Sequence, residues 1–305
     1  MKPNLRITTL IAFLFVFFGG KAQTVKVPIK SPVLSNRTGI APAFFGPNAF
    51  PVPDMLNGDR LKKCKIEIYT DHYFGTITTA KEDYTANIFA KLAVPLFSSR
   101  VNLNLWGNLF EYYSVSPAVN KYRCVEGGVH TKGTLVGDIY ISTDITMLCQ
   151  EKNWLDMVLR VALKTASGGE FGKARYYDNA GYFFDATFGK RFFFPDNKCS
   201  MKLALASGFL CWQTDNGRQN DAVMYGVRLD FNAKAFMASA EWGGYVGWEN
   251  FGDAPMVLKL NASYSLGDFD VTAGYRAGLV DWPFHQVRLG LRYHLPLFTK
   301  KNTKD

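Results

Sequence analysis

The chain has 305 residues, a formal net charge of +9 and 48% hydrophobic residues. A mean hydropathy of −0.07 excludes a bundle of apolar transmembrane helices, and the apolar content excludes a disordered, low-complexity chain. The pI of about 9.2 is compatible with nucleic-acid binding, but the first residues of the chain argue against that class of partner.

Residues 1–22 have the pattern of a cleavable secretory signal peptide. Two basic residues precede an apolar run over residues 7–18, and small residues lead to Ala22. The run is too short for a membrane-spanning helix. Removal of the three basic residues of this signal would lower the net charge from +9 to +6. An exported chain beginning at Gln23 would not meet genomic DNA, so we expect no nucleic-acid partner.

Residues 23–61 are rich in proline and show no regular alternation. Phe45, Asn48, Phe50 and Asp54 lie in a hydrophobic stretch that holds too much proline for a helix or a central strand. Because the phenylalanines require burial, we predict an ordered segment, which either plugs the domain that follows or docks onto a periplasmic or membrane partner. A disordered tether is the alternative interpretation.

Twelve later segments alternate between apolar and polar residues, the pattern of strands with two chemically different faces. Many are 10 to 14 residues long, whereas strands of soluble proteins cluster near ~5–6 residues and a tilted strand crosses a bilayer in ~9–11 residues. The predicted strands are residues 63–75, 83–96, 100–113, 134–147, 155–166, 180–193, 200–213, 222–232, 235–247, 256–266, 268–279 and 284–297.

The connections between these strands alternate in length. Even-numbered connections are short, and one of them consists of Gly267 alone. The exception is a medium turn at Leu148–Trp154. Odd-numbered connections are longer and richer in Gly or polar residues, and the longest is Ser114–Gly133. Outer-membrane barrels have short periplasmic turns and longer external loops. A soluble β-sandwich has no reason to sort its loops in this way.

In these features the chain resembles the outer-membrane β-barrel proteins of Gram-negative bacteria. The resemblance covers residues 62–298 and includes an aromatic-rich last strand, but it indicates no particular family. It implies an all-β, porin-like fold: a closed antiparallel transmembrane β-barrel of twelve strands, surrounded by outer-membrane lipid. Residues 299–305 would form a charged periplasmic tail. A secreted soluble all-β protein is the alternative interpretation.

The inward faces of the predicted strands carry ten basic and nine acidic residues. In a narrow barrel such balanced charges can pair and close the lumen. Arg276, Arg288 and Arg292 could instead form a track for anionic solutes, with Glu67 and Asp71 across the closing seam as their alternative partners. The candidate lumen-lining residues are Arg160, Arg228, Arg276, Arg288, Arg292, Glu67, Asp71, Asp185, Asp230 and Glu241.

Neither the cysteines nor the histidines define a catalytic or metal site. The five cysteines are an odd number, and their spacing demands no disulfide. His72 and His285 are predicted to project outward near the external rim, where outer-membrane lipid hydrolases hold a catalytic His and Ser. No outward Ser accompanies them in the predicted strands. We therefore expect no enzyme, no metal and no cofactor.

Three functions can be compared. The inward arginines favour a narrow channel for small or anionic solutes. The balanced charges and residues 23–61 favour a non-conducting accessory subunit of an outer-membrane protein complex, with other outer-membrane proteins as partners. A lipid-modifying outer-membrane enzyme is the third hypothesis, and the incomplete His and Ser set argues against it.

Overall fold

The computed structural model describes residues 45–76, 83–96, 99–123, 131–169, 175–177, 179–195, 198–214, 218–248 and 252–295. The predictions for residues 1–22, 23–44 and 299–305 lie outside these ranges. Within them the fold is almost entirely β, with one short helix, α2, at Pro117–Tyr122. The strands are β1 Cys64–Gly75, β2 Asp83–Leu96, β3 Val101–Val115, β4 Lys132–Leu135, β5 Ile139–Leu148, β6 Asp156–Lys164, β7 Gly181–Phe193, β8 Cys199–Thr214, β9 Arg218–Ala233, β10 Phe236–Gly247, β11 Met256–Leu266, β12 Phe269–Val280 and β13 Phe284–Leu295.

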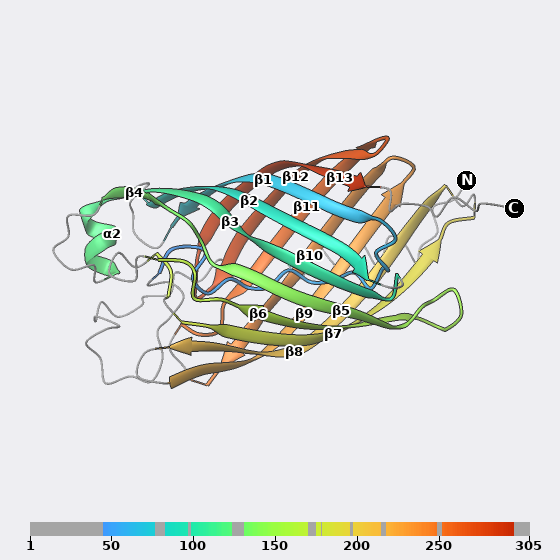
Figure 1. Ribbon diagram of the computed structural model, residues 1–305, viewed down its shortest axis with the longest axis horizontal. Helices are drawn as coiled ribbons and strands as arrows, with labels where there is room; N and C mark the ends of the chain where they lie inside the picture. Colours follow the sequence, from blue (N-terminus) through green and yellow to red (C-terminus); the bar gives the residue numbers. More distant parts are fainter. Residues whose placement is uncertain are drawn as a thin grey trace, which may run out of the picture.

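Twelve of the described strands close into one antiparallel barrel (Figure 1). β3 pairs with both β2 and β5, and β13 returns to pair with β1. This closing seam runs from Cys64 opposite Leu295 to Gly75 opposite Phe284. Closure leaves no barrel strand with an unpaired edge, which is the condition for crossing a bilayer with strands. The predicted all-β, closed antiparallel barrel of twelve strands is confirmed.

One predicted strand, residues 134–147, was wrong. The structure has β4, an irregular stretch over residues 136–138, and then β5. β4 pairs only with the end of β3 and stands outside the barrel as an extra strand. The apolar residues Leu135 and Ile139 keep the alternating phase across the break, so the pattern concealed it. α2, in the long connection between β3 and β4, was not predicted.

Three strand pairs have a register shift, and in two of them consecutive apolar residues lie on the outer face. In β3, Leu109 and Phe110 are both exposed on the outer face, so the next residue, Glu111, turns into the barrel and is fully buried. In β5, Met147 and Leu148 are likewise both exposed. An unbroken period of two therefore fails to predict which face the residues beyond a bulge occupy.

The outer surface of the barrel is apolar and exposed on every strand. In a globular protein these side chains would form the core, whereas here no protein covers them, and the surface matches the hydrocarbon region of a bilayer. Among the described residues, no helix combines the length and the apolar composition needed to cross a membrane. The exposed apolar residues include Ile66, Ile68, Ile88, Leu103, Leu105, Ile141, Val161, Leu163, Phe184, Leu203, Leu205, Val227, Val246, Leu260, Val271, Leu289 and Leu291.

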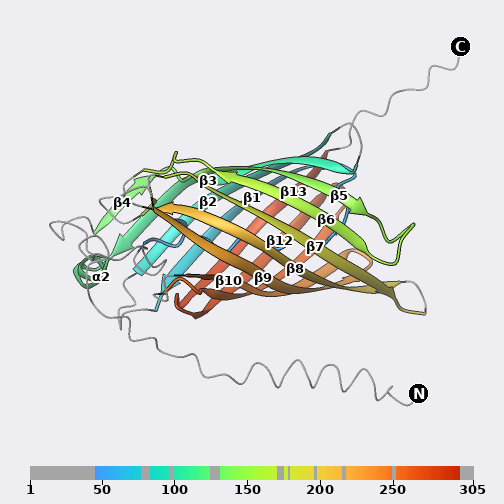
Figure 2. The same cartoon turned by 90° about the horizontal axis from the view of Figure 1, so that it is seen from below.

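The two ends of the barrel differ. At one end, short turns join β2 to β3, β7 to β8, β9 to β10 and β11 to β12, and the same end holds the start of β1 and the end of β13. We call this the short-turn end. The opposite, long-loop end carries α2 and β4 (Figure 2). In outer-membrane barrels the short turns face the periplasm and the long loops face outward.

Candidate functional site

Residues 45–61, the described part of the Pro-rich segment, run through the inside of the barrel and are called the lumen segment below. Asp59 contacts Lys202 near the short-turn end, and Asn48 contacts Glu111 near the long-loop end. In Figure 1 the segment is the blue trace within the barrel. The described part of the segment therefore lies inside the barrel, and its two predicted roles, plug and docking element, stay predictions.

The segment completes a buried aromatic core at the long-loop end, which we call the aromatic cap. Phe45 and Phe50 are each 2% exposed, and their ring centroids lie 5.4 and 5.5 Å from that of Tyr177. Burial of each phenylalanine stabilises the cap by about 1.5–3 kcal/mol. The other large aromatic members are Tyr73, Tyr140, Phe183, Trp212, Tyr245, Trp282 and Phe284.

A buried polar network fixes Asn48 beside the cap. Its Nδ2 donates to Glu111 Oε2 at 2.6 Å and to Asn87 Oδ1 at 3.1 Å. Glu111 also accepts from Arg175 Nε at 2.7 Å and from the Tyr176 hydroxyl at 2.9 Å. Burial and the neighbouring Glu111 carboxylate raise the pKa of Tyr176, so the phenol keeps its proton and remains a donor. The fully buried Glu111 carboxylate is thus satisfied by three donors.

Farther toward the short-turn end, cations of the barrel wall hold the backbone of the segment. Prolines supply no N–H, and the segment joins no sheet, so its buried carbonyls need donors from the wall. Each such bond to a charged donor contributes about 1.5–3 kcal/mol. The bonds run from Arg160 to the carbonyl of Asp54 at 2.9 Å, from Arg228 to that of Met55 at 3.2 Å, and from Lys259 to those of Val52 and Pro53 at 3.1 and 3.0 Å.

Two carboxylates of the segment bind the wall as well. Asp54 lies 2.8 Å from both Lys259 Nζ and Arg276 Nη2, and Asp59 lies 2.7 Å from Lys202 Nζ. Burial alone would raise the pKa of Asp59, but the Lys202 ammonium and a second cation, Arg191, lower it below its usual range. Asp59 therefore stays ionised at neutral pH and stabilises the inserted position of the segment.

The wall also makes room for the segment. Gly226 on β9 faces the Met55 side chain, and a Cβ at Gly189 on β7 would lie 2.9 Å from the carbonyl oxygen of Asn57. A larger residue at either position would press on the segment. These two glycines therefore leave space for the lumen segment beside β7 and β9.

All ten predicted lumen charges lie on the inner face, with side chains no more than 19% exposed. Across the closing seam Arg288 binds Asp71, with Nε 2.5 Å from Oδ1, and Arg292 Nε lies 3.4 Å from Glu67 Oε1. Arg276, the third member of the hypothetical anion track, is bound to Asp54 of the lumen segment. The remaining candidates pair as Arg160 with Asp185 at 2.7 Å and Arg228 with Asp230 at 2.8 Å and with Glu241 at 3.6 Å.

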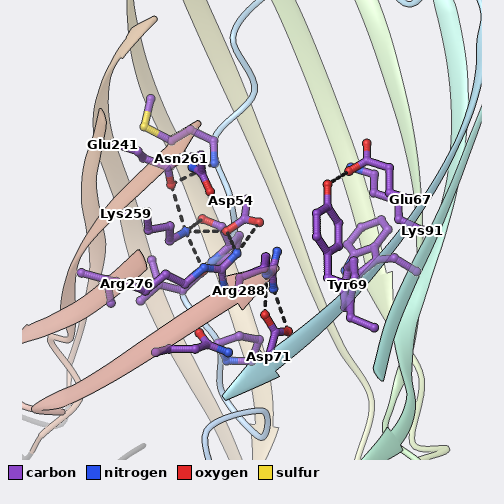
Figure 3. A pocket seen from close by; sticks show the side chains of 18 of the residues that line it. Asp54, Glu67, Tyr69, Asp71, Lys91, Glu241, Lys259, Asn261, Arg276 and Arg288 are labelled. Carbon is purple, nitrogen blue, oxygen red and sulfur yellow. Dashed lines mark hydrogen bonds and ion pairs between the residues drawn. The ribbon is translucent and has the colours of Figure 1, made fainter. Parts of the chain in front are cut away.

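A cavity of about 290 Å³ remains beside the lumen segment. Figure 3 shows Asp54 with Lys259 and Arg276 on one side of it, and Glu67, Tyr69 and Lys91 on the other. Charged, amide, hydroxyl and aromatic groups of β1, β2, β3 and β5 form the second side, which we call the open wall. Its residues are Glu67, Tyr69, Phe89, Lys91, Asn104, Trp106, Tyr140, Ser142 and Asp144.

The histidines predicted to face outward pair with tyrosines. His72 Nδ1 lies 2.7 Å from the Tyr84 hydroxyl, and His285 Nδ1 lies 2.6 Å from that of Tyr275. Cys64, Cys149, Cys199 and Cys211 are free, and Cys124 lies outside the described residues. Within the described ranges no group of three or more His, Cys, Asp or Glu side chains is placed to hold a metal ion.

Sequence reasoning missed several residues that fix the lumen segment. Glu111 was missed because the β3 bulge reverses its face. Arg175 and Tyr176 lie between β6 and β7, where no periodicity indicates contact with the lumen. Asp59 lies close to Asp54 in the same non-alternating segment, and neither its spacing nor its neighbours predicted Lys202 as its partner.

No known protein family and no curated protein matches the sequence. Among solved structures, the NanC porin structure has a TM-score of 0.50 at 7% identity, covering 75% of this chain and 100% of that chain. The KdgM porin has a TM-score of 0.46 at 10% identity, with 76% and 99% covered. The transport unit of the autotransporter AIDA-I from Escherichia coli has 0.46 at 13%, with 79% and 93% covered. The chain has the fold of an outer-membrane β-barrel. At these identities the similarity concerns the fold alone.

Proposed function

We propose that the chain is an outer-membrane channel for small polar solutes, narrowed and gated by the lumen segment. The observation that carries the proposal is the cavity of about 290 Å³ between the segment and the open wall. An interior packed only for stability leaves few voids larger than a water molecule. This interior leaves room for a small solute among polar and aromatic groups, as in ligand sites generally.

The proposed solutes are small and polar rather than anionic as a class. Arg276, Arg288 and Arg292 would attract anions if they were free, but each lies within ion-pair distance of a carboxylate. Their charge is therefore largely neutralised inside the lumen. The aromatic cap and the wall-bound segment together restrict the path, so passage of solutes requires part of the segment to move.

Recording from planar bilayers tests the channel. The full-length protein is compared with a Phe45→Ala, Phe50→Ala, Asp54→Asn, Asp59→Asn variant, which loosens the lumen segment and leaves every barrel strand unchanged. We expect small, infrequent openings for the unaltered protein and several-fold larger or longer openings for the variant. If neither protein conducts while both show heat-modifiable gel migration, which reports a folded barrel, the channel proposal is wrong.

A second candidate is a non-conducting accessory subunit of an outer-membrane complex. The observation that favours it is the full burial of the aromatic cap together with the wall cations bound to segment carbonyls. Purification from mild detergent extracts separates the candidates. Stoichiometric co-purification with another outer-membrane protein, combined with no conductance, would favour the subunit, whereas a conducting barrel that purifies alone would favour the channel.

Delivery to the outer membrane follows, in this proposal, from export by the signal in residues 1–22. Cleavage after Ala22 would leave Gln23 as the first residue. Amino-terminal sequencing of the protein from outer-membrane fractions tests this, because a chain that still begins with Met1 would contradict cleavage.

A further inference from the structure

The cavity beside the lumen segment is lined by seven cations and six carboxylates, and all but two of them are ion-paired. Within the described residues, Lys91 on β2 is the cation with no carboxylate within 4 Å, and Asp144 on β5 is the carboxylate with no Lys or Arg nitrogen within 4 Å. The paired cations are Arg160, Arg228, Lys259, Arg276, Arg288 and Arg292. The paired carboxylates are Asp54, Glu67, Asp71, Asp138 and Glu241.

Asp144 is 7% exposed and is held by neutral donors. Asn104 Nδ2 lies 2.9 Å from its Oδ2, and the Ser142 hydroxyl lies 3.2 Å from its Oδ1. Arg160 is opposite Asp144 in the β5–β6 register but is bound to Asp185. Asp144, Arg160 and Asp185 together therefore carry one net negative charge, and Asp144 lines the cavity.

Lys91 is the counterpart on the same open wall. Its Nζ lies 5.6 Å from the centroid of the Trp106 ring. Glu67, directly opposite Lys91 in the β1–β2 register, accepts from the Tyr69 hydroxyl and is ion-paired with Arg292. Glu67 is thus already ion-paired with Arg292, and it attracts Lys91 only from beyond ion-pair distance.

Two stacked aromatic rings lie on β3 and β5 at the level of Lys91. The rings of Trp106 and Tyr140 are stacked, with centroids 5.3 Å apart and planes 12° from parallel. The Tyr140 hydroxyl is buried and has no hydrogen-bond partner among the described residues, although Tyr140 lines the cavity. Because this oxygen is buried, Tyr140 offers its ring to the cavity rather than its hydroxyl group.

The spacing of the charges limits the class of ligand. Lys91 is level with Trp106 and, through it, with Tyr140, whereas Asp144 lies four residues farther along β5. Two strand spacings and four residues separate the backbone positions of Lys91 and Asp144. These spacings are roughly 10 Å across the sheet and roughly 13 Å along it. No single ion bridges such a distance, but an extended peptide, which rises roughly 3.3 Å per residue, does.

We infer that the open wall binds short zwitterionic peptides of a few residues, with the peptide carboxylate at Lys91 and the ammonium group at Asp144. Apolar side chains of the peptide lie on the Trp106 ring. The inference deepens the proposed channel function and rests on it, because it names the class of solute that the lumen selects.

Titration calorimetry of the full-length protein in detergent tests the inference with three probes. Trialanine carries both terminal charges, N-acetyl-trialanine lacks the ammonium group, and trialanine amide lacks the carboxylate. We expect trialanine to bind most tightly and each modified peptide to bind roughly tenfold more weakly, the effect of one lost charge-assisted hydrogen bond. Equal binding of the three probes, or no binding of trialanine, would overturn the inference without any variant having to fold.

Two variants then assign each charge to its partner. Asp144→Asn should weaken trialanine roughly tenfold and abolish the preference over N-acetyl-trialanine, while Lys91→Met should abolish the preference over trialanine amide. Lys62→Met and Asp268→Asn make the same changes at exposed positions and should leave binding unchanged. Preferences that survive in Asp144→Asn and Lys91→Met would contradict the assignment.

The same measurements separate this inference from the channel proposal. Selective binding of trialanine by a protein that never conducts would support the peptide site and overturn the channel. A conducting protein that binds the three probes equally would support the channel and overturn the peptide site.

Discussion

The two sides of the cavity carry similar charged side chains, but only those of one side are bound by the lumen segment. We call the side formed by β6 to β12 the contacted wall. There Lys259 is 2% exposed and has acceptors on the lumen segment and on Glu241. On the open wall Lys91 has no ion-pair partner among the described residues and faces the cavity. The contrast shows that inward charge alone does not define a solute path. A lumen cation is available to a solute only where the chain itself does not bind it.

The largest expected effect comes from the aromatic cap. Each Phe→Ala change at a buried position costs about 3–5 kcal/mol, so Phe45→Ala/Phe50→Ala should release the outer part of the lumen segment. Hydrogen exchange of the amides in residues 48–59 should accelerate by at least roughly 100-fold, while exchange in the barrel strands stays as before. Unchanged exchange in the segment would show that the cap does not hold it.

Removing a cation from the contacted wall should be nearly as damaging. Lys259→Met leaves the buried Glu241 carboxylate and two segment carbonyls without this donor, and breaking a buried ion pair costs about 3–5 kcal/mol. Urea unfolding in lipid vesicles measures the loss of stability. A change of less than about 1 kcal/mol would mean that the segment does not depend on this wall.

A smaller effect is expected at Asp54, because its side chain is 53% exposed although it binds two cations. After allowance for solvent, Asp54→Asn should cost about 1 kcal/mol. That loss corresponds to a roughly fivefold increase in the open fraction of a channel gated by the segment, measured in planar bilayers. An open fraction equal to that of the unaltered protein would remove Asp54 from the gate.

Acid should loosen the segment through Asp59. Because the pKa of Asp59 is lowered in the folded protein, its ion pairs stabilise the inserted segment above the ordinary carboxyl pKa of about 3.9. This stabilisation is lost as the pH falls through the lowered value. Exchange of segment amides, corrected for intrinsic rates, should therefore rise in acid, and Asp59→Asn should flatten that rise.

The smallest effect on stability is expected on the open wall. Lys91→Met removes a cation that contacts the Trp106 ring, worth about 0.5–1 kcal/mol, and that attracts Glu67 only from beyond ion-pair distance. Its effect on urea unfolding should thus be several times smaller than that of Lys259→Met, although the change is chemically the same. Equal effects would erase the distinction between the two walls.

The barrel could be predicted from the sequence because lipid on one face and water or polar groups on the other impose a period of two. Residues such as Ile66 and Glu67 show this directly, one exposed to the membrane and the next ion-paired inside. Closure brings the first and last strands together, so the arginines of the last strand could be predicted to meet Glu67 and Asp71 across the seam. The particular pairs, Arg288 with Asp71 and Arg292 with Glu67, come from the structure.

The site was less predictable, because it is built where periodicity ends. The lumen segment has no repeating pattern, and its contacts with Lys202 and Lys259 join residues more than 140 positions apart. Glu111 follows a bulge that the sequence does not mark. The sequence shows that Phe45 and Phe50 need burial, but their burial site depends on how the closed barrel surrounds them.

Carbodiimide cross-linking of the full-length protein tests the central claim, that the lumen segment lies bound inside the barrel. This reagent joins a carboxylate to an amine in contact with it, and Asp54 and Asp59 are both accessible enough to react, at 53% and 42% side-chain exposure. The account predicts amide cross-links from Asp54 to Lys259 and from Asp59 to Lys202, absent in Asp54→Asn/Asp59→Asn, and a channel that no longer opens after cross-linking. A folded barrel in which neither carboxylate becomes linked to the wall would contradict it.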